Sequence, residues 1–499
     1  MRIALVAIGR RENRYAREFV EHYIRLGFDH VFICDNNHDG EERFEDVLQD
    51  YVDEGSVTVH DYRNRQGVQC RAYNEVYREY GHRYDFLAFF DFDELLTMSD
   101  GLGVKQWLDP FLATPCDTVL VNWMCYGDCG MLYDDGRKLA ERFTEPLPFD
   151  KAVQYDFPNN NHVKSIVRGG LSEIRFGKNP HVPDTARHCY RADWQPCEAS
   201  PFQPYDFSVC HLKHFATKTV EEWMQNKWTK GTGNKPSMEA FRSKYEGRFF
   251  RYNDETPEKR AYVDAFQRNS ERRITVCIVN YNTTSLTRAA ICSLRRHTPG
   301  AGVIVFDNSD REPFPPMDGV EVIDNTRGQV IDFDRFLAKF PDKVDVGNGW
   351  ASAKHCYSVH WLVTKRSRPF ILMDSDVLVQ RDISCFWDRE QAFVGQVKPH
   401  RSAFKITVNR VLPFLCFVNV PMMKQHSVSY FSYAKMWALN SRTPDKAYDT
   451  GCWFLEDVRN HRLPYRDVSI DPYVLHFGHG SWHDKSPESW LEEHRDLWR

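Results

Sequence analysis

The sequence of 499 residues lacks an apolar run long enough to cross a membrane, and it lacks paired cysteine motifs. Its longest apolar stretch, residues 411–423, is interrupted by Pro413, Asn419 and Pro421 and is shorter than the roughly 20 residues of a membrane-spanning helix. The fourteen cysteines form no CxxC pair, a distribution typical of free thiols in a reducing cytosol. The opening MRIALVAIGRRENRY places its charges after the apolar run, which predicts a first β-strand and not a signal peptide.

A surplus of positive charge is also missing. The formal net charge is −5, whereas a nucleic-acid-binding protein normally carries a basic excess. A hydrophobic content of 42% and a charged content of 27% are those of a soluble globular protein. The length predicts two or three domains.

One polar, charged segment divides the chain into two similar halves. It covers residues 251–272, contains a predicted helix from Pro257 to Gln267, and precedes a new strand pattern, ITVCIVNYN. We therefore predict an N-terminal domain over 1–250, a helical linker over 251–272 and a C-terminal domain over 273–499.

Strands and helices alternate in both halves. In the first half we predict, in order, a strand over Ile3–Ile8, a helix over Glu12–Leu26, a strand ending at Asp35, a helix over Glu42–Tyr51, a strand over Ser56–His60, a helix over Gly67–Tyr80 and the strand FLAFF. In the second half we predict a strand over Ile274–Val279, a helix over Thr284–Arg296, a strand ending at Asp307, the short strand EVIDN, a helix over Ala351–Thr364 and the strand FILM. This alternation indicates parallel βαβ units, so the predicted class is α/β.

The aspartates that end these strands are similarly spaced in the two halves. Asp35 lies 32 residues after Ile3, and Asp307 lies 33 residues after Ile274. The carboxyl ends of parallel strands form the crevice in which open α/β sheets bind ligands. The repeated spacing therefore predicts one ligand site in each half.

Each half also contains an Asp-X-Asp motif directly after a buried strand, in FFDFDE and LMDSDV. Residues i and i+2 of an extended segment point to the same side, so Asp91 and Asp93, like Asp374 and Asp376, can face one ligand. Such paired carboxylates suit a hard cation such as Mn²⁺ or Mg²⁺ that is shared with diphosphate oxygens. Solvated acids at a strand end are the alternative, and the second copy of the motif argues against it.

Four blocks of the first half resemble glycosyltransferases of the family 92 type, which have the GT-A fold. The blocks are RRENRYAREFVEHYIRLGFDHVFICDNNHDG, QCRAYNEVYREYGHRYDFLAFFDFDELL, HVKSIVR and HLKHFATKTVEEWMQNKWTKG. The resemblance implies that Asp91 and Asp93 bind metal and nucleotide-sugar and that His214 completes the metal site. It also implies that Asp35 contacts the nucleoside. Phe215 stands where the family usually has Tyr.

The same resemblance places Lys164 and Lys218 near the diphosphate of the donor. The family inverts the configuration of the transferred sugar, which requires a carboxylate base to take the proton of the acceptor hydroxyl. Asp128, in NWMCYGDCG, and Asp206 are the candidates, and the sequence leaves both open.

The second half is similar to a divergent GT-A domain of the family 2 type, in TVCIVNYNTTSLTRAAICSL and VIVFDNSD. The resemblance implies that Asp307 contacts the base or ribose. It further implies that Asp374 and Asp376 hold the metal, with Asp374 also facing the donor.

The end of the second half, VLHFGHGSWHDK, resembles the closing loop in which many GT-A enzymes return a histidine to the metal. His476 and His479 are both possible ligands, and Gly478 and Gly480 would allow a close approach to the diphosphate. In YDTGCWFLEDV, the catalytic base or acceptor-binding acid is sought among Asp449, Glu456 and Asp457, with Asp449 preferred because it precedes a Thr-Gly turn.

Together these patterns predict two GT-A domains in tandem, which are Rossmann-like nucleotide-diphospho-sugar transferase folds. The expected function is a bifunctional, metal-dependent bacterial glycosyltransferase that transfers sugars from nucleotide-sugars, with UDP-sugars expected by analogy, to a surface glycan such as capsule or O-antigen. In the alternative, one domain is active and the other binds acceptor or is structural. We expect a cytoplasmic protein with no nucleic-acid partner. A lipid-linked acceptor would be compatible with peripheral association at the inner face of the cytoplasmic membrane.

Two other functions, a carbohydrate-binding protein and a nucleotidylyltransferase, are weighed as alternatives to a glycosyltransferase. A non-catalytic carbohydrate-binding protein would be expected to have lost the Asp-X-Asp acids, which are present. A nucleotidylyltransferase would need a glycine-rich basic loop near the first strand, and AIGRRENR matches that pattern poorly. The C-terminal SPESWLEEHRDLWR is expected to be a packed tail, with a dimer-contacting helix as the alternative.

Overall fold

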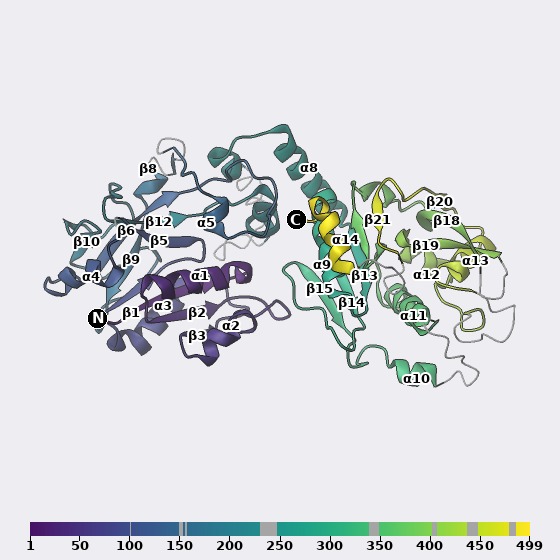
Figure 1. Cartoon of the computed structure of the whole chain (residues 1–499), viewed down its shortest axis with the longest axis horizontal. Coiled ribbons are helices and arrows are strands. Elements are labelled where there is room, and N and C mark those ends of the chain that lie inside the picture. The colour runs from purple at the N-terminus through teal and green to yellow at the C-terminus, as the bar shows by residue number, and fades with distance from the viewer. Residues whose placement is uncertain are drawn as a thin grey trace. The chain divides into compact units, whose positions relative to one another are not determined.

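The structure is a computed structural model of the chain, and it describes residues 1–99, 101–148, 153–154, 157–229, 247–338, 349–401, 407–436, 448–478 and 486–499 (Figure 1). The chain divides into two compact units, which we call the first unit (Met1–Arg260) and the second unit (Ala261–Arg499). Helix α8 (Pro257–Arg272) includes the point of division. No helix in the described ranges combines the length and the apolarity that a membrane span requires.

The first unit is built on one large mixed sheet. Its main elements are β1 (Ile3–Gly9), α1 (Asn13–Leu26), β2 (His30–Asp35), α2 (Phe44–Asp53), β3 (Val57–Asp61), α3 (Gln69–Tyr80), β4 (Phe86–Phe89), β5 (Glu94–Met98), α4 (Val104–Leu112), β6 (Thr118–Cys125), β9 (Val163–Arg168), β10 (Cys189–Arg191), β11 (Pro196–Cys197), β12 (Cys210–His214), α6 (Val220–Glu222) and a π-helical turn over Trp223–Trp228. The strand order is β11-β10-β6-β9-β4-β1-β2-β3.

Helices cover both faces of this sheet. Apolar side chains of α1, α2 and α4 pack with one face of β1 and β2, while those of α3 pack with the other face. Strands β1 to β4 are parallel, and β9 runs antiparallel between β4 and β6. The strand order reverses at β1, which has β2 on one side and β4 on the other. In open α/β sheets, ligands bind beyond the carboxyl ends of the strands at such a switch point, here those of β1 and β4.

The second unit repeats this plan. Its main elements are β13 (Thr275–Asn280), α9 (Thr284–His297), β14 (Gly302–Asp307), β15 (Val320–Asp324), α10 (Phe333–Leu337), α11 (Gly349–Lys365), β16 (Phe370–Asp374), β17 (Val377–Val379), β18 (Phe393–Arg401), β19 (Thr407–Val418), α12 (Val420–Gln425), α13 (Cys452–Asn460), β20 (Arg466–Asp467), β21 (Val474–His476) and α14 (Pro487–Glu493). The order β15-β14-β13-β16-β19-β18-β20 again has four parallel strands followed by an antiparallel one.

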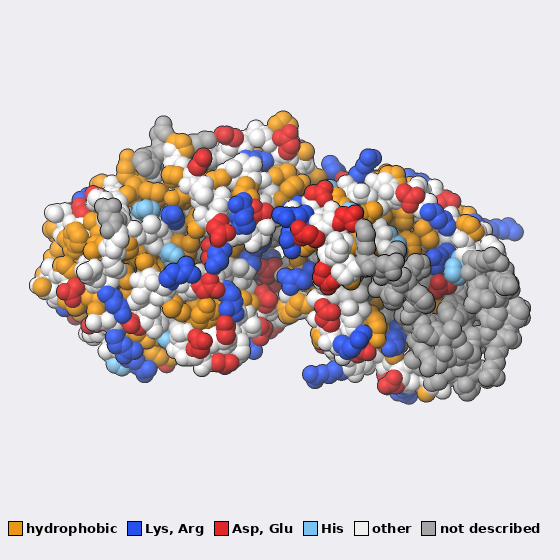
Figure 2. Space-filling view, viewed as in Figure 1, with side chains coloured by type: hydrophobic (Ala, Val, Ile, Leu, Met, Phe, Trp, Pro, Cys, Tyr) orange, Lys and Arg blue, Asp and Glu red, His pale blue; other side chains and the backbone are white. Residues whose placement is uncertain are grey.

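The predicted α/β class is confirmed, and the predicted strands and helices lie within a few residues of the observed ones. The C-terminal segment is a packed tail, as expected, because Trp490 and Leu491 are buried against Leu286 of α9 and Phe477. On the visible face of each unit, basic and acidic side chains are interspersed (Figure 2), in keeping with the small net charge.

Candidate active sites

The first site forms where β4 ends and the chain turns into β5. Antiparallel pairing with β5 places His214, the last residue of β12, directly opposite Glu94. One ligand atom from each of Asp93, Glu94 and His214 lies within 4.8 Å of the others. His214 Nε2 is 3.9 Å from Asp93 Oδ1, and burial lowers the pKa of His214 to about 3, so its imidazole is neutral and able to bind a cation.

Asp91 is not brought into this group. Its carboxylate is held instead by a lysine, an amide and a hydroxyl group. Lys164 Nζ donates to Asp91 Oδ2 at 2.7 Å, while Gln69 Nε2 and Tyr73 Oη donate to Oδ1 at 2.9 and 3.3 Å. The acid that joins Asp93 is Glu94, whose pKa is raised well above its usual range by burial and by the neighbouring carboxylates.

Two further lysines approach Asp93 from the segment after β12. Lys227 Nζ lies 3.4 Å and Lys218 Nζ 3.8 Å from Asp93 Oδ2. Lys218 is buried and has φ of 57°, a left-handed conformation that costs a non-glycine residue free energy. Lys227 lies in the π-helical turn, a rare geometry that often occurs at functional sites. Burial by itself would raise the pKa of Asp93, but these lysines and His214 hold it well below its usual range.

The second site lies at the carboxyl end of β16. Asp374, Asp376 and His476 each place one ligand atom within 4.8 Å of the others, so the structure brings together these three predicted ligands. His476 Nε2 is 3.2 Å from Asp376 Oδ1, and His355 Nε2 of α11 is 3.2 Å from Asp374 Oδ1. The ring of Phe414 stacks on His476 at 3.7 Å between centroids. His479 and Gly480 lie outside the described residues, while Gly478 adopts φ of 67°.

The two sites share the same strand register. His214 pairs with Glu94, the residue after Asp93, and His476 pairs with Val377, the residue after Asp376. In addition, the N–H of Phe215 donates to the carbonyl of Asp93 at 2.8 Å, and that of Phe477 donates to Asp376 at 2.9 Å. His476 is therefore the structural counterpart of His214.

The register also shows where the sites differ. Ser165 of β9 pairs with Phe89 of β4. Because the two strands are antiparallel, one step further brings Lys164 opposite Phe90, the residue that precedes Asp91. In the second unit, Leu415 of β19 is opposite Met373, the residue that precedes Asp374. Lys164 and Glu94 of the first site thus correspond to Leu415 and Val377 of the second. Lys164 Nζ is 3.6 Å from Glu94 Oε1, and both side chains are fully buried.

Asp35 and Asp307 occupy equivalent places at the ends of β2 and β14. One oxygen of each accepts from the backbone N–H two residues later, at 2.9 Å in Asp35 and 3.1 Å in Asp307. The other oxygen accepts from the N–H of Phe44 or Phe314, at 3.2 and 2.7 Å. Both carboxylates are buried and shape the loops after their strands, and their predicted contact with the nucleoside stays a prediction.

The predicted bases of the first unit lie in different surroundings. Asp128 is buried, with Lys259 Nζ 2.5 Å from Oδ2 and the N–H of Gly130 donating to Oδ1 at 2.9 Å. Asp206 is half-buried and accepts from both the N–H and the hydroxyl of Ser208. Neither residue contacts the described members of the first site.

In the second unit the structure separates the three candidate acids. Asp449 Oδ2 accepts from Arg410 Nη1 at 3.0 Å and lies 3.9 Å from His400 Nε2. Burial raises the pKa of Asp374, but His355 and His476 lower it further and bring it below its usual value. Arg410 adds a smaller effect in the same lowering direction. Arg410 thus pairs with Asp449 and also acts on the charge of Asp374. Glu456 accepts from Tyr448, and the buried Asp457 accepts from the N–H of Ser429 at 2.8 Å.

The second site fits a divalent cation better than the first does. Its two carboxylates and one imidazole are suitable donors, and among the described residues neither Asp374 nor Asp376 is paired with lysine or arginine. At the first site, a cation bound to Asp93 Oδ2 would lie within about 6 Å of Lys227 Nζ, a repulsion of about 5 kcal/mol at an effective dielectric constant of about 20. The lysines would have to move before a divalent cation could bind there.

The sequence interpretation missed four residues of these sites: Glu94, Lys227, His355 and Arg410. Glu94 directly follows the first Asp-X-Asp motif, and Lys227 lies in the closing block HLKHFATKTVEEWMQNKWTKG, so both had a signal. His355 and Arg410 reach their site through helix packing and strand pairing, for which the local sequence carries no signal.

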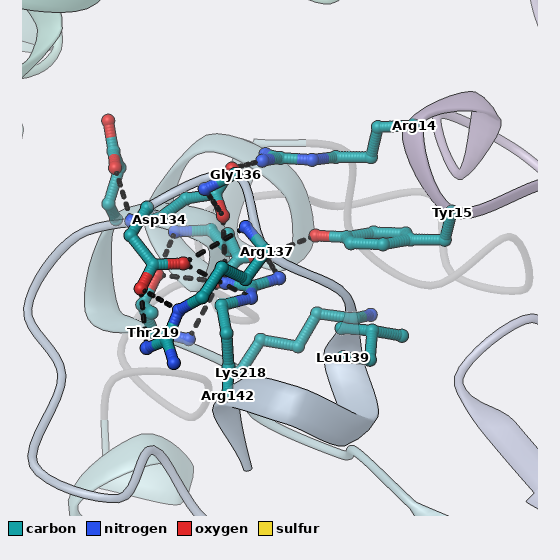
Figure 3. Close-up of polar contacts among 12 residues, drawn as sticks. Arg14, Tyr15, Asp134, Gly136, Arg137, Leu139, Arg142, Lys218 and Thr219 are labelled. Carbon is teal, nitrogen blue, oxygen red and sulfur yellow. Dashed lines mark hydrogen bonds and ion pairs between the residues drawn. The ribbon is translucent and has the colours of Figure 1, made fainter. Parts of the chain in front are cut away.

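A network of ion pairs and hydrogen bonds in the first unit includes Arg142, Asp134 and Thr219, the residue after Lys218 (Figure 3). Glu222 accepts from both terminal nitrogens of Arg142 at 2.9 and 3.0 Å, from the N–H and hydroxyl of Thr219 at 3.0 and 2.7 Å, and from Tyr15. Arg142 and Arg14 also pair with Asp134. The network fixes the segment that continues from His214 through Lys218 to the π-helical turn.

Comparison with known proteins agrees with the first unit's resemblance. Residues 11–117 match the family model of glycosyltransferase family 92, which confirms the resemblance over that range. No curated protein matches the chain. The resemblance of the second half to the family 2 type stays a prediction.

Several solved glycosyltransferase structures are similar to parts of the chain. Galactosyltransferase LgtC, solved with donor and acceptor sugar analogs, is 13% identical over 45% of this chain and 95% of its own, with a TM-score of 0.30. GlyE of Streptococcus pneumoniae TIGR4 is 13% identical over 44% of this chain and 59% of its own, with a TM-score of 0.28. TarS 1–349 of S. aureus is 10% identical over 50% of this chain and 70% of its own, with a TM-score of 0.26.

Proposed function

We propose that the chain is a glycosyltransferase with two nucleotide-sugar sites, one in each unit. The observation that carries the proposal is the shared register, which places an aspartate of each Asp-X-Asp motif beside a histidine at the crevice of each sheet. The family 92 match over residues 11–117 supports a transferase function for the first unit. UDP-sugars are the proposed donors, and a bacterial surface glycan is the proposed acceptor.

At the second site we propose that Asp374, Asp376 and His476 hold Mn²⁺ or Mg²⁺. The bound cation supplies positive charge that stabilises the departing nucleoside diphosphate. Asp449 is the proposed base for the acceptor hydroxyl, because Arg410 and His400 hold its carboxylate in place near the site. General-base catalysis of this kind contributes about 10²–10⁴-fold to the rate.

At the first site we propose that Lys164, Lys218 and Lys227 face the diphosphate. Ammonium groups are point charges that bind phosphate well, and all three lysines already converge on the two aspartates of the motif. A base from the first unit would complete an inverting reaction, and Asp128 and Asp206 remain the proposals for it.

Single substitutions test whether both sites work. Asp93→Asn and Asp376→Asn should each abolish one transfer and spare the other, as measured by mass spectrometry of products from a panel of UDP-sugars and glycan acceptors. Asp50→Asn and Asp471→Asn remove exposed carboxylates from the same units and should leave both transfers unchanged. If neither site variant alters any product, the proposed function is wrong.

In the alternative, only one unit transfers sugar and the other binds acceptor. This alternative is supported by the lysines that pair with the acids of the first site, because two sites of different charge need not carry out the same reaction. It predicts that one of the two aspartate variants loses all transfer, while the other loses only acceptor affinity, seen as a raised KM with unchanged kcat.

A further inference from the structure

Among the residues that the structure describes, lysines lie beside the acids of the first site, and none pairs with Asp374 or Asp376 of the second. In the first unit, three carboxylates (Asp91, Asp93 and Glu94) face three lysines (Lys164, Lys218 and Lys227) within 4.0 Å. In the second unit, the described partners of Asp374 and Asp376 are the imidazoles of His355 and His476. Strand pairing shows that two of the charged residues of the first site have apolar residues at the equivalent positions of the second. Leu415 stands in the place of Lys164, and Val377 stands in the place of Glu94.

We infer that the first site binds the donor diphosphate through lysines without a divalent cation, whereas the second site requires one. The inference rests on the proposed function, since it assumes that both sites take a nucleoside diphosphate.

Two of the three lysines are buried and the third is partly exposed. The Lys164 side chain is completely buried, Lys218 is 4% exposed and Lys227 is 28% exposed. Lys218 also lies 3.5 Å from Glu12 Oε2 and over the ring of Tyr15 at 4.5 Å, so its ammonium group is held from three sides. The left-handed backbone at Lys218 and the π-helical turn at Lys227 are both costly, and both aim an ammonium group at Asp93.

Lys218 and Lys227 can bind phosphate without leaving Asp93, and Lys164 can do so without leaving Asp91. An ammonium group carries three donors, so a lysine can hold its carboxylate with one and donate to a phosphate oxygen with another. In this arrangement Asp93 holds the ammonium groups of Lys218 and Lys227 in place, and these groups take the position of a metal ion beside its carboxylate. A divalent cation added to this set would be repelled by the lysines that already occupy the same carboxylate.

Binding measurements on the full chain separate the two sites. Asp376→Asn removes a ligand from the second site, so UDP binding by that variant reports the first site. We expect its Kd for UDP, measured by calorimetry, to differ by less than about 3-fold between EDTA and MnCl₂, since the lysines supply the charge. Loss of UDP binding in EDTA would overturn the inference.

A lysine variant tests the cause. In the Asp376→Asn background, Lys227→Gln should weaken UDP binding in EDTA by about 10-fold or more, because a charge-assisted hydrogen bond is lost. Lys227→Arg should retain most of the affinity. Lys213→Gln is the matched control, since Lys213 is the neighbour of His214 on β12 but contacts the ring of Tyr126. If Lys227→Gln behaves like Lys213→Gln, the inference is wrong.

Metal stoichiometry gives an independent readout. Electron paramagnetic resonance of Mn²⁺ should show one bound ion in the wild-type chain with UDP, and Asp376→Asn should lose it. A second bound ion that Asp93→Asn removes would contradict the inference. If no UDP or GDP binds to either site, with or without Mn²⁺, it is the proposed function that fails and not the difference between the sites.

Discussion

Glu222 is the residue whose replacement should most weaken the first unit. It accepts five hydrogen bonds, two of them from Arg142, whose side chain is 1% exposed. Glu222→Gln removes the negative charge and leaves Arg142 buried with Asp134 as its remaining close partner. Breaking a buried ion pair costs about 3–5 kcal/mol, and we expect about 3 kcal/mol because glutamine retains one acceptor.

Urea unfolding at pH 7 measures this loss. With a slope near 3 kcal/mol per molar urea for a unit of this size, the midpoint of the affected transition should fall by about 1 M. Since the chain has two units, two transitions are expected, and the variant should shift only that of the first unit. Glu45→Gln is the control, because it removes a surface ion pair with Arg43 and should change the free energy of unfolding by less than about 0.5 kcal/mol.

The effect of pH provides a second check. Burial raises the pKa of Glu222, but Arg14 and Arg142 outweigh it and lower the pKa below its usual value. The group therefore contributes its full stability above its unfolded pKa, near 4.5, and loses it as pH falls toward the folded pKa. The difference between wild type and Glu222→Gln should be constant from pH 7 to about 5 and shrink below that. A loss below about 1 kcal/mol at pH 7, or a difference independent of pH down to 3, would refute the reasoning.

Three further outcomes are expected in the second unit. Gly451→Ala should destabilise it by about 2 kcal/mol or more in thermal unfolding, since Gly451 has φ of 82° and a Cβ there would meet the Val411 carbonyl oxygen at 2.1 Å. Trp490→Ala should cost about 3–5 kcal/mol, because it empties a buried site against Phe477; a loss under about 1 kcal/mol would mean that the tail does not pack there. Asp449→Asn should lower kcat by about 10²-fold or more with UDP affinity unchanged, and an unaltered kcat would exclude Asp449 as the base.

Much of the framework of both units could be predicted from the sequence. The strands and helices around Asp35 and Asp307 follow from local apolar periodicity, which is why their bounds agree with the structure to a few residues. The sequence predicts His476 and His479 as alternative ligands; strand pairing brings His476 beside the second motif, and His479 lies outside the described residues.

The composition of the first site could not be predicted in the same way. Both motifs turn at the same place, yet Asp374 joins the ligand group of its site whereas Asp91 pairs with Lys164 and Glu94 joins Asp93. Lys164 reaches its partner across 73 residues of sequence, and Lys227 does so through a π-helical turn. The blocks that contain these lysines point to the donor site, but the carboxylates with which they pair depend on packing and cannot be read from the local sequence.

The buried Lys164–Glu94 pair also constrains how the two sites could have diverged. If the units descend from one ancestor, the order of the two changes matters. A lysine in the place of Leu415 would lie beside Asp374, the counterpart of the Asp91 that pairs with Lys164, so it would be buried with a partner. A glutamate in the place of Val377 would instead be buried next to Asp376 without a lysine among its described neighbours, and an unpaired buried charge costs about 3–5 kcal/mol. The lysine is therefore the change that could come first, and the glutamate the one that depends on it.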